Sequence, residues 1–143
     1  MTRATREIVY SALFAKLQSV PGLVTVSRRL KNVQDVQPEE FPAAYQLQGE
    51  QLNKYTGTTP AVYTWKCDWL LYAYSADPTI APSTALNNLI DAAVAVLAPP
   101  FGKQTLGGLV EYCAIDGNIH VFEGVLGDRA VAVLPIVIVL PGF

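Results

Sequence analysis

The sequence predicts a single α+β domain, in which two α-helices pack on one face of a mixed or antiparallel β-sheet. Apolar residues keep helical spacing in two segments and alternate in several others. The order along the chain is helix, two or three strands, helix and three strands, and the last three form a C-terminal β-meander. The length of 143 residues suits one domain, 1–143, with its own hydrophobic core.

The composition favours a protein that assembles with other chains. Hydrophobic residues make up 51% of the sequence and charged residues 15%, below the roughly 25% of typical soluble domains. Much of the surface is therefore expected to be neutral or covered, although Thr, Gln, Ser and Asn offer an alternative source of neutrality. The net charge of −2 argues against sequence-specific nucleic-acid binding. We expect no secretory signal and no membrane span, because the longest apolar stretch, Ala130–Leu140, is too short to cross a bilayer.

The first elements are a helix and a strand. Helical spacing over Thr5–Val20 predicts an amphipathic helix, which the following Pro-Gly pair ends. Leu23–Leu30 then alternates, as a half-buried strand does.

Two polar stretches follow, with a short predicted strand, Ala43–Gln48, between them. We predict that Lys31–Pro42 and Gly49–Pro60 are exposed loops. Loops of this length in a small domain are usually functional or mobile, so both are candidate contact surfaces.

The segment Ala61–Tyr74 predicts a long strand at the centre of the chain. Its odd-numbered residues are apolar throughout. Among its even-numbered residues, Thr64, Lys66 and Asp68 are polar and the later ones are apolar. One face should therefore be wet early in the strand, and both faces should be covered later. The strand is longer than a small sheet usually needs, so we expect it to bend at a bulge or to project. Trp65 and Trp69 share the apolar face and indicate core packing, with an aromatic ligand platform as the alternative.

The apolar stripe of Leu86–Leu97 predicts the second helix, with Ser83 or Thr84 as its N-cap and the Pro99-Pro100 pair after its end. Three strands are then predicted, over Thr105–Ile115, Ile119–Leu126 and Arg129–Leu140.

Proline in the last strand suggests where that strand lies. Proline has no N–H for a β-ladder, so Pro135 favours a position at or near a sheet edge. A long apolar edge aggregates unless another chain covers it. We therefore expect a neighbouring subunit to pair with this strand, and the candidate self-assembly residues are Val131, Val133, Pro135 and Val137.

We expect no catalytic, cofactor-binding or metal-binding residues. His120 is the only histidine, and strand geometry directs it away from Glu123, while Asp116 belongs to a turn. The interpretation is a surface or interface histidine, because acid–base catalysis needs partners within hydrogen-bond reach. Cys67 and Cys113 lack a paired metal spacing and are expected to be buried free thiols, with a disulfide as the alternative.

Candidate contacts with other proteins lie in the two polar stretches and at the strand end before the first of them. These residues are Arg28, Arg29, Lys31, Glu39, Glu40, Lys54 and Tyr55.

Several passages, taken in their order and spacing, resemble one known family over nearly the whole chain. They are the helix from Arg6-Glu7-Ile8 to Leu17, Phe41-Pro42-Ala43-Ala44-Tyr45, the mid-chain aromatic strand, the Leu86–Leu97 helix, Gln104-Thr105-Leu106-Gly107-Gly108-Leu109-Val110, and Gly127-Asp128-Arg129-Ala130 with Leu134-Pro135-Ile136-Val137-Ile138. Together they resemble the tail-terminator (tail-completion) proteins of long-tailed bacteriophages, including the lambda-like minor tail protein U group.

The resemblance implies a structural virion protein at the head-proximal end of the tail, assembled in the host cytoplasm. Such a protein forms a homohexameric ring that caps the tail tube, ends tail polymerisation and joins the tail to the head connector. The implied partners are further copies of the chain, the tail tube protein, the head–tail connector protein and DNA that passes through the lumen without sequence recognition. No cofactor, active site or membrane is implied.

Two alternatives remain. A neck (head–tail connector) protein of the same virion joint would have similar features. A small α+β cone ligand-binding protein or enzyme would need polar groups in a pocket between helix and curved sheet, and only Asp68 and His120 are candidates for that role.

Overall fold

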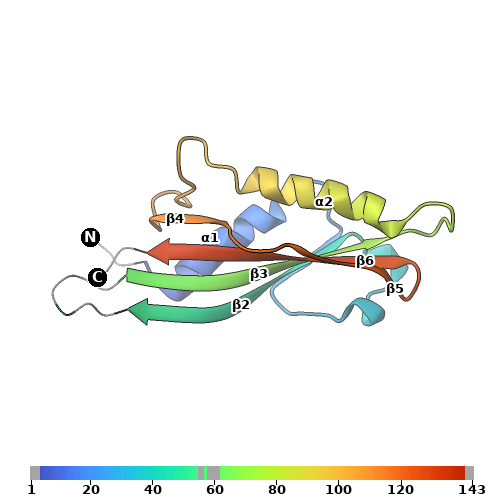
Figure 1. The fold of residues 1–143 in the computed structure, drawn as a ribbon, viewed down its shortest axis with the longest axis horizontal. Coiled ribbons are helices and arrows are strands. Elements are labelled where there is room, and N and C mark those ends of the chain that lie inside the picture. Colours follow the sequence, from blue (N-terminus) through green and yellow to red (C-terminus); the bar gives the residue numbers. More distant parts are fainter. Residues whose placement is uncertain (1–3, 55–56, 58–61, 141–143) are drawn as a thin grey trace.

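The computed structural model describes residues 4–54, 57 and 62–140. Within them the chain forms two α-helices and a mixed sheet of six strands, which confirms the predicted α+β class. Helix α1 spans Arg6–Gln18 and helix α2 spans Pro82–Val96. Apolar residues of both helices join one core cluster with the same face of the sheet, so both helices cover that face, as predicted (Figure 1).

Three long strands form the centre of the sheet, and three short ones lie outside them (Figure 1). The order is β1-β2-β3-β6, and both β4 and β5 pair with the far side of β6. Strand β1 runs parallel to β2, and the other pairings are antiparallel. The strands are β1 (Thr25–Ser27), β2 (Ala43–Lys54), β3 (Val62–Tyr74), β4 (Tyr112–Ile115), β5 (His120–Val125) and β6 (Arg129–Leu140).

The helices begin at residues whose chemistry suits a helix start. Thr5 caps α1, because its hydroxyl accepts a hydrogen bond from the Ile8 N–H at 3.3 Å. Helix α2 begins at Pro82, which has no N–H to leave unpaired in the first turn and a φ already suited to a helix. The predicted caps Ser83 and Thr84 therefore lie inside α2, and that prediction is wrong.

The main core lies between the helices and the sheet. Odd-numbered residues of β3 and even-numbered residues of β6 point into it, as the period of two requires. Trp65 and Trp69 are buried there, which confirms the core-packing interpretation. On the other face of β3, Lys66 is exposed and Tyr72 is buried, so the predicted change from a wet face to a covered one is also confirmed.

Strand β3 is paired along its length and needs no bulge of its own. The irregularity lies in its neighbour β2, where the register shifts between Gln48 and Gln51. Residues 49–54 continue β2 and are not part of a loop, so the predicted loop Gly49–Pro60 is wrong over that stretch. Its polar residues suit an outer strand, whose side chains meet water, equally well.

The segment between β1 and β2 is more ordered than the predicted exposed loop. It contains two 3₁₀ turns, Val33–Asp35 and Pro38–Glu40, and it buries Val36 and Phe41 against the sheet face opposite the helices. Arg129 at the start of β6 holds the segment against the sheet, because its Nη1 donates hydrogen bonds to the backbone carbonyls of residues 33 and 34 at 3.2 and 3.4 Å. The strand predicted before it is much shorter than expected and consists of β1 alone.

Strand β6 is an inner strand, so the prediction that it lies at an edge is wrong. It pairs with β3 along its whole length on one side and with β5 and then β4 on the other. Pro135 falls between the stretches that pair with β5 and β4, opposite the turn that links them. There the Asp116 N–H donates to the Pro135 carbonyl at 3.0 Å, and a Cβ on Gly117 would lie 3.3 Å from the proline ring. The absent proline N–H thus faces the turn, at the point where the pairing of β6 passes from β5 to β4.

The four candidate self-assembly residues therefore lie on a sheet face and not on a free edge. Val131 and Val133 pack against the segment between β1 and β2, and Val137 is also buried. The backbone of these residues is paired or faces the turn, so β6 offers no ladder to a second chain.

The C-terminal third contains three strands, as predicted, and its first strand is shorter than expected. The predicted β-meander is only partly formed, because β5 pairs with β6 as the next strand in sequence, whereas β4 also pairs with β6 and not with β5. Residues 105–109 form turns, with Leu106, Gly107 and Gly108 at positive φ, and β4 begins only at Tyr112. Strands β4 and β5 then lie one after the other along the same side of β6.

We predict that Gln46→Ala destabilises the fold by about 2–3 kcal/mol. The buried Gln46 side chain accepts a hydrogen bond from the Trp69 indole N–H at 3.1 Å and donates one to the Tyr10 carbonyl at 2.9 Å, so it joins β2 and β3 to α1. Its removal leaves a cavity and a buried indole N–H without a partner. Urea unfolding measures the change, and exposed Gln34→Ala, the matched control, should stay within about 0.5 kcal/mol of wild type. Equal stabilities for the two variants would contradict this role.

Candidate functional site

Three of the predicted partner contacts are used inside the chain. The Arg28 guanidinium binds the Glu7 carboxylate at 2.7 Å and the Gln48 side chain at 3.0 Å, which links β1 to α1 and β2. Lys31 binds Glu40 at 2.9 Å across the two 3₁₀ turns. These four charged groups therefore hold the segment around β1 in place, and their charges are largely neutralised locally.

The pKa shifts of the carboxyl groups follow from these contacts. The hydrogen bond from Arg28 lowers the pKa of Glu7. The Gln37 backbone N–H, and then Lys31, lower the pKa of Glu40. The Glu7 carboxylate is exposed and the Glu40 carboxylate is half-buried, so both pairs remain in contact with solvent; they help orient the segment and contribute little stability.

The remaining predicted contacts are free to meet a partner. Arg29, Glu39 and Lys54 are exposed, and their side chains form no ion pair with another described residue. Tyr55 lies outside the described residues.

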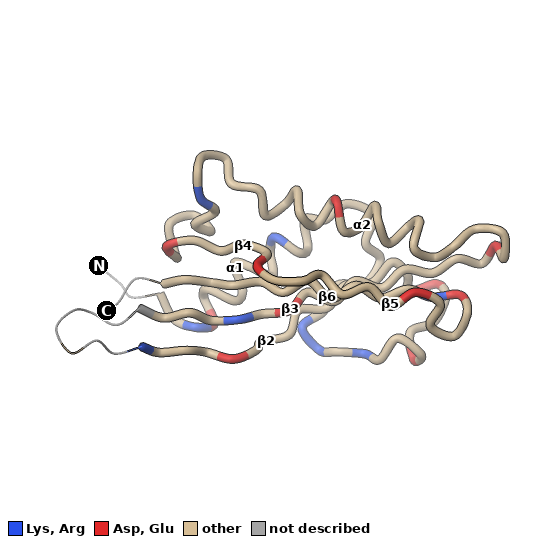
Figure 2. The backbone as a smooth tube through the Cα atoms, in the orientation of Figure 1, with Lys and Arg blue, Asp and Glu red and all other residues tan. Residues whose placement is uncertain are grey.

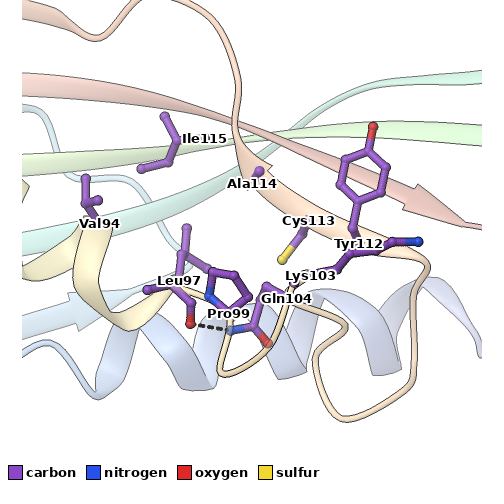
Figure 3. A pocket seen from close by; sticks show the side chains of 11 residues that line it. Val94, Leu97, Pro99, Lys103, Gln104, Tyr112, Cys113, Ala114 and Ile115 are labelled. Carbon is purple, nitrogen blue, oxygen red and sulfur yellow. Dashed lines mark hydrogen bonds between the residues drawn. The ribbon is translucent and has the colours of Figure 1, made fainter.

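A cavity of about 430 Å³ opens between the C-terminal end of α2 and β4. Figure 3 shows Val94 of α2 and Leu97, the C-cap of that helix, on one side of it and Cys113 and Ile115 of β4 on the other. The buried Gln104 fixes its floor: the side-chain amide donates to the carbonyl of residue 98 at 3.3 Å, and the backbone carbonyl accepts from the Cys113 N–H at 2.9 Å. The lining is mostly apolar.

The chemistry of this cavity suits binding better than catalysis. Burial raises the pKa of the Cys113 thiol to about 11, so the thiol stays protonated and weakly nucleophilic at neutral pH. The Lys103 ammonium at the rim binds the Glu111 carboxylate at 2.7 Å. An apolar side chain or a small apolar molecule is the occupant that this lining fits.

The structure does not bring His120 and Glu123 together as an acid–base pair. His120 pairs with Val133 and lies on the sheet face opposite the helices, whereas Glu123 pairs with Ala130 on the helix face. The Glu123 carboxylate accepts a hydrogen bond from the Ser83 hydroxyl of α2.

Asp68 and Asp116 line a smaller cavity of about 230 Å³ together with Lys66. Among the described residues, no group of three or more His, Cys, Asp and Glu side chains comes together to hold a metal ion. Cys67 and Cys113 are buried free thiols, as predicted.

Exposed apolar side chains concentrate along the two borders of the sheet, a feature that the sequence did not predict. The first border, made by α1 and β1, carries Ile8, Val24 and Leu30. The second border is made by β4, β5 and the chain that leads from α2 to β4. Its most exposed side chain is Phe101, with 90% of its surface accessible, and it also carries Tyr112, Val121 and Phe122. Strand periodicity gives a side chain's face but not whether the strand has a neighbour, so only the fold reveals these borders.

Comparison with protein-family models and with curated proteins finds no match to this chain. In the part of the chain that the structure describes, neither helix is long and apolar enough to span a membrane. The surfaces described above and the resemblance in sequence are therefore the basis for a functional proposal.

We predict that stability falls with rising pH above about 9 because of the two thiols. Burial raises the pKa of Cys67 from 9.0 to about 12 and that of Cys113 from 9.0 to about 11. The native state then keeps protons that the unfolded state releases, so the free energy of unfolding decreases, approaching about 1.4 kcal/mol per pH unit for each thiol. The loss begins at the unfolded pKa and is complete above the folded one.

Urea unfolding between pH 9 and 10 measures this slope together with a smaller contribution from the buried tyrosines. Burial raises the pKa of Tyr72, for example, from 10.0 to about 12, and an unfolded tyrosine is already partly ionised in this interval. The double variant Cys67→Ala/Cys113→Ala should show a much flatter slope in that interval, whatever its absolute stability. An unchanged slope would rule out the thiols as its source.

Proposed function

We propose that this chain is a structural subunit of a bacteriophage virion, a tail terminator that assembles into a ring on the tail tube. In this role it ends tail polymerisation and joins the tail to the head connector, at the head-proximal end of the tail. The observation that carries the assembly part of the proposal is the row of exposed apolar side chains along both borders of the sheet.

The fold leaves these borders uncovered while it covers the sheet elsewhere. The two helices shield one face, and the segment between β1 and β2 shields part of the other. Among the described residues, β4 and β5 pair only with β6, and β1 pairs only with β2. Outer strands that expose apolar side chains favour association with another chain.

The assignment to a tail terminator comes from the resemblance in sequence, and the fold is compatible with it. An α+β subunit is what that resemblance implies, and the sheet has that architecture. Glu39 offers an exposed charge for a contact with the tube protein or the connector protein. The net charge of −2 suits a lumen through which DNA passes, because a strongly basic lumen would retain the phosphate backbone.

Binding of a small apolar molecule is a second candidate function, favoured by the cavity beside β4. Its volume of about 430 Å³ lies within the range of small-molecule sites, and its lining is largely apolar. A ligand-binding protein of this kind would work as a monomer with the cavity filled, whereas an assembly subunit would present the cavity to a neighbour. Native mass measurement distinguishes the two.

We predict that the purified chain caps tail tubes grown from the tail tube protein of the same phage. Electron microscopy should show rings on tube ends, and tubes grown in its presence should be shorter, because capped ends cannot add subunits. An unrelated α+β protein of similar size and charge serves as the control. Uncapped tubes of unchanged length would contradict the proposal, and binding to the connector alone would favour a neck protein instead.

A further inference from the structure

The two borders of the sheet differ in charge. The second border carries Glu111 just before β4, Asp116 just after it and Glu123 on β5, and the Lys103 cation there is already paired with Glu111. Figure 2 shows acidic residues along β4 and β5. Carboxylates therefore exceed cations along this edge.

The first border, extended here to the adjoining part of β2, has an excess of cations. Arg29 and Lys54 are exposed without a carboxylate partner among the described residues. Arg6 binds the neutral Gln51 side chain at 2.7 Å, so no carboxylate offsets its charge there. The charge of Arg28 is balanced by Glu7. The other carboxylate on α1, β1 and the adjoining part of β2 is that of Glu50.

Apolar groups match across the borders as well. The second border offers the apolar cavity beside β4 and the exposed Phe122, with 54% of its surface accessible. The first offers three aliphatic side chains, of which Val24 is 60% exposed. Aliphatic side chains of this size are suited to filling such a cavity.

We propose that copies of the chain pair head to tail, with the second border of one copy against the first border of the next. This deepens the proposed function, since it names the surfaces through which the assembling subunit contacts itself. Carboxylates then meet cations, and the aliphatic side chains of one copy cover the cavity and the β4–β5 edge of its neighbour.

The charges of the two borders favour this head-to-tail arrangement over a two-fold dimer. A two-fold contact through the second border would oppose Glu111, Asp116 and Glu123 to the same residues of the partner, and like charges across an interface are costly. A head-to-tail contact uses two different surfaces, so an open chain of copies keeps one surface of each kind uncovered at its two ends until the assembly closes. Self-association through these borders should also weaken as salt rises.

Charge reversal on each border tests the pairing. Sedimentation at low salt should show that wild type associates, and that Glu123→Lys or Arg29→Glu alone raises the dissociation constant at least about tenfold. An equimolar mixture of the two variants should regain association, because the reversed borders attract each other and the unaltered borders remain complementary. Asp91→Lys on α2 carries the same change of charge as Glu123→Lys and should stay within about twofold of wild type.

Several results would overturn the pairing. These are a wild-type chain that stays monomeric at about 100 µM, a mixture that fails to associate, or a control variant that weakens association as much as the border variants. Tube capping is scored separately. Capping by border variants that assemble like wild type would overturn the pairing and leave the terminator role intact, whereas restored association without capping would support the pairing and remove that role.

Discussion

The missing N–H of Pro135 shapes the outer half of the sheet. Strand β6 is long and apolar and is paired with β3 throughout, so its other side must also be paired if its backbone is to be satisfied. Proline cannot donate there, and the ladder divides at that residue into a stretch held by β5 and a stretch held by β4. The turn between these strands packs on the proline ring and donates the Asp116 N–H to the proline carbonyl. One residue thus sets the lengths of two outer strands and the position of the turn between them.

Local sequence patterns predicted where helices and strands occur better than they predicted which elements lie next to each other. Helical spacing and strict alternation found both helices, β3 and β6, because burial on one face leaves a periodic signal in the sequence. Pro135 was read as a mark of an edge, yet a gap between two neighbouring strands satisfies proline equally well, and only the tertiary pairing decides between them. The polar residues 49–54 were predicted as loop because an outer strand and a loop both face water. The burial of Val36 and Phe41 likewise depends on a distant surface.

The candidate contact surfaces also depend on tertiary neighbours that local sequence patterns do not reveal. Sequence reasoning identified Arg28, Lys31 and Glu40 as charged and locally clustered, but it had no means of finding their partners inside the chain, one of which is Glu7 on the first helix. The apolar borders went unpredicted for a related reason. Val121 and Phe122 look like any alternating strand residues, and their exposure follows from the outer position of β5. In contrast, the buried thiols and the packed tryptophans were predicted correctly, because each lies in a strongly apolar strand.

The contacts of α1 with the sheet give the protein a built-in optical reporter. Both tryptophans of the chain sense this helix: the Trp65 ring stacks on Tyr10 with 5.7 Å between ring centroids, and Trp69 is linked to the Tyr10 carbonyl through Gln46. Helix α2 contains no tryptophan or tyrosine. Indole emission therefore reports on the docking of α1, and it also senses α2, because apolar residues of α2 join the same core cluster as both tryptophans. Fluorescence combined with helical circular dichroism would separate undocking of the helices from the sheet from loss of their helical structure.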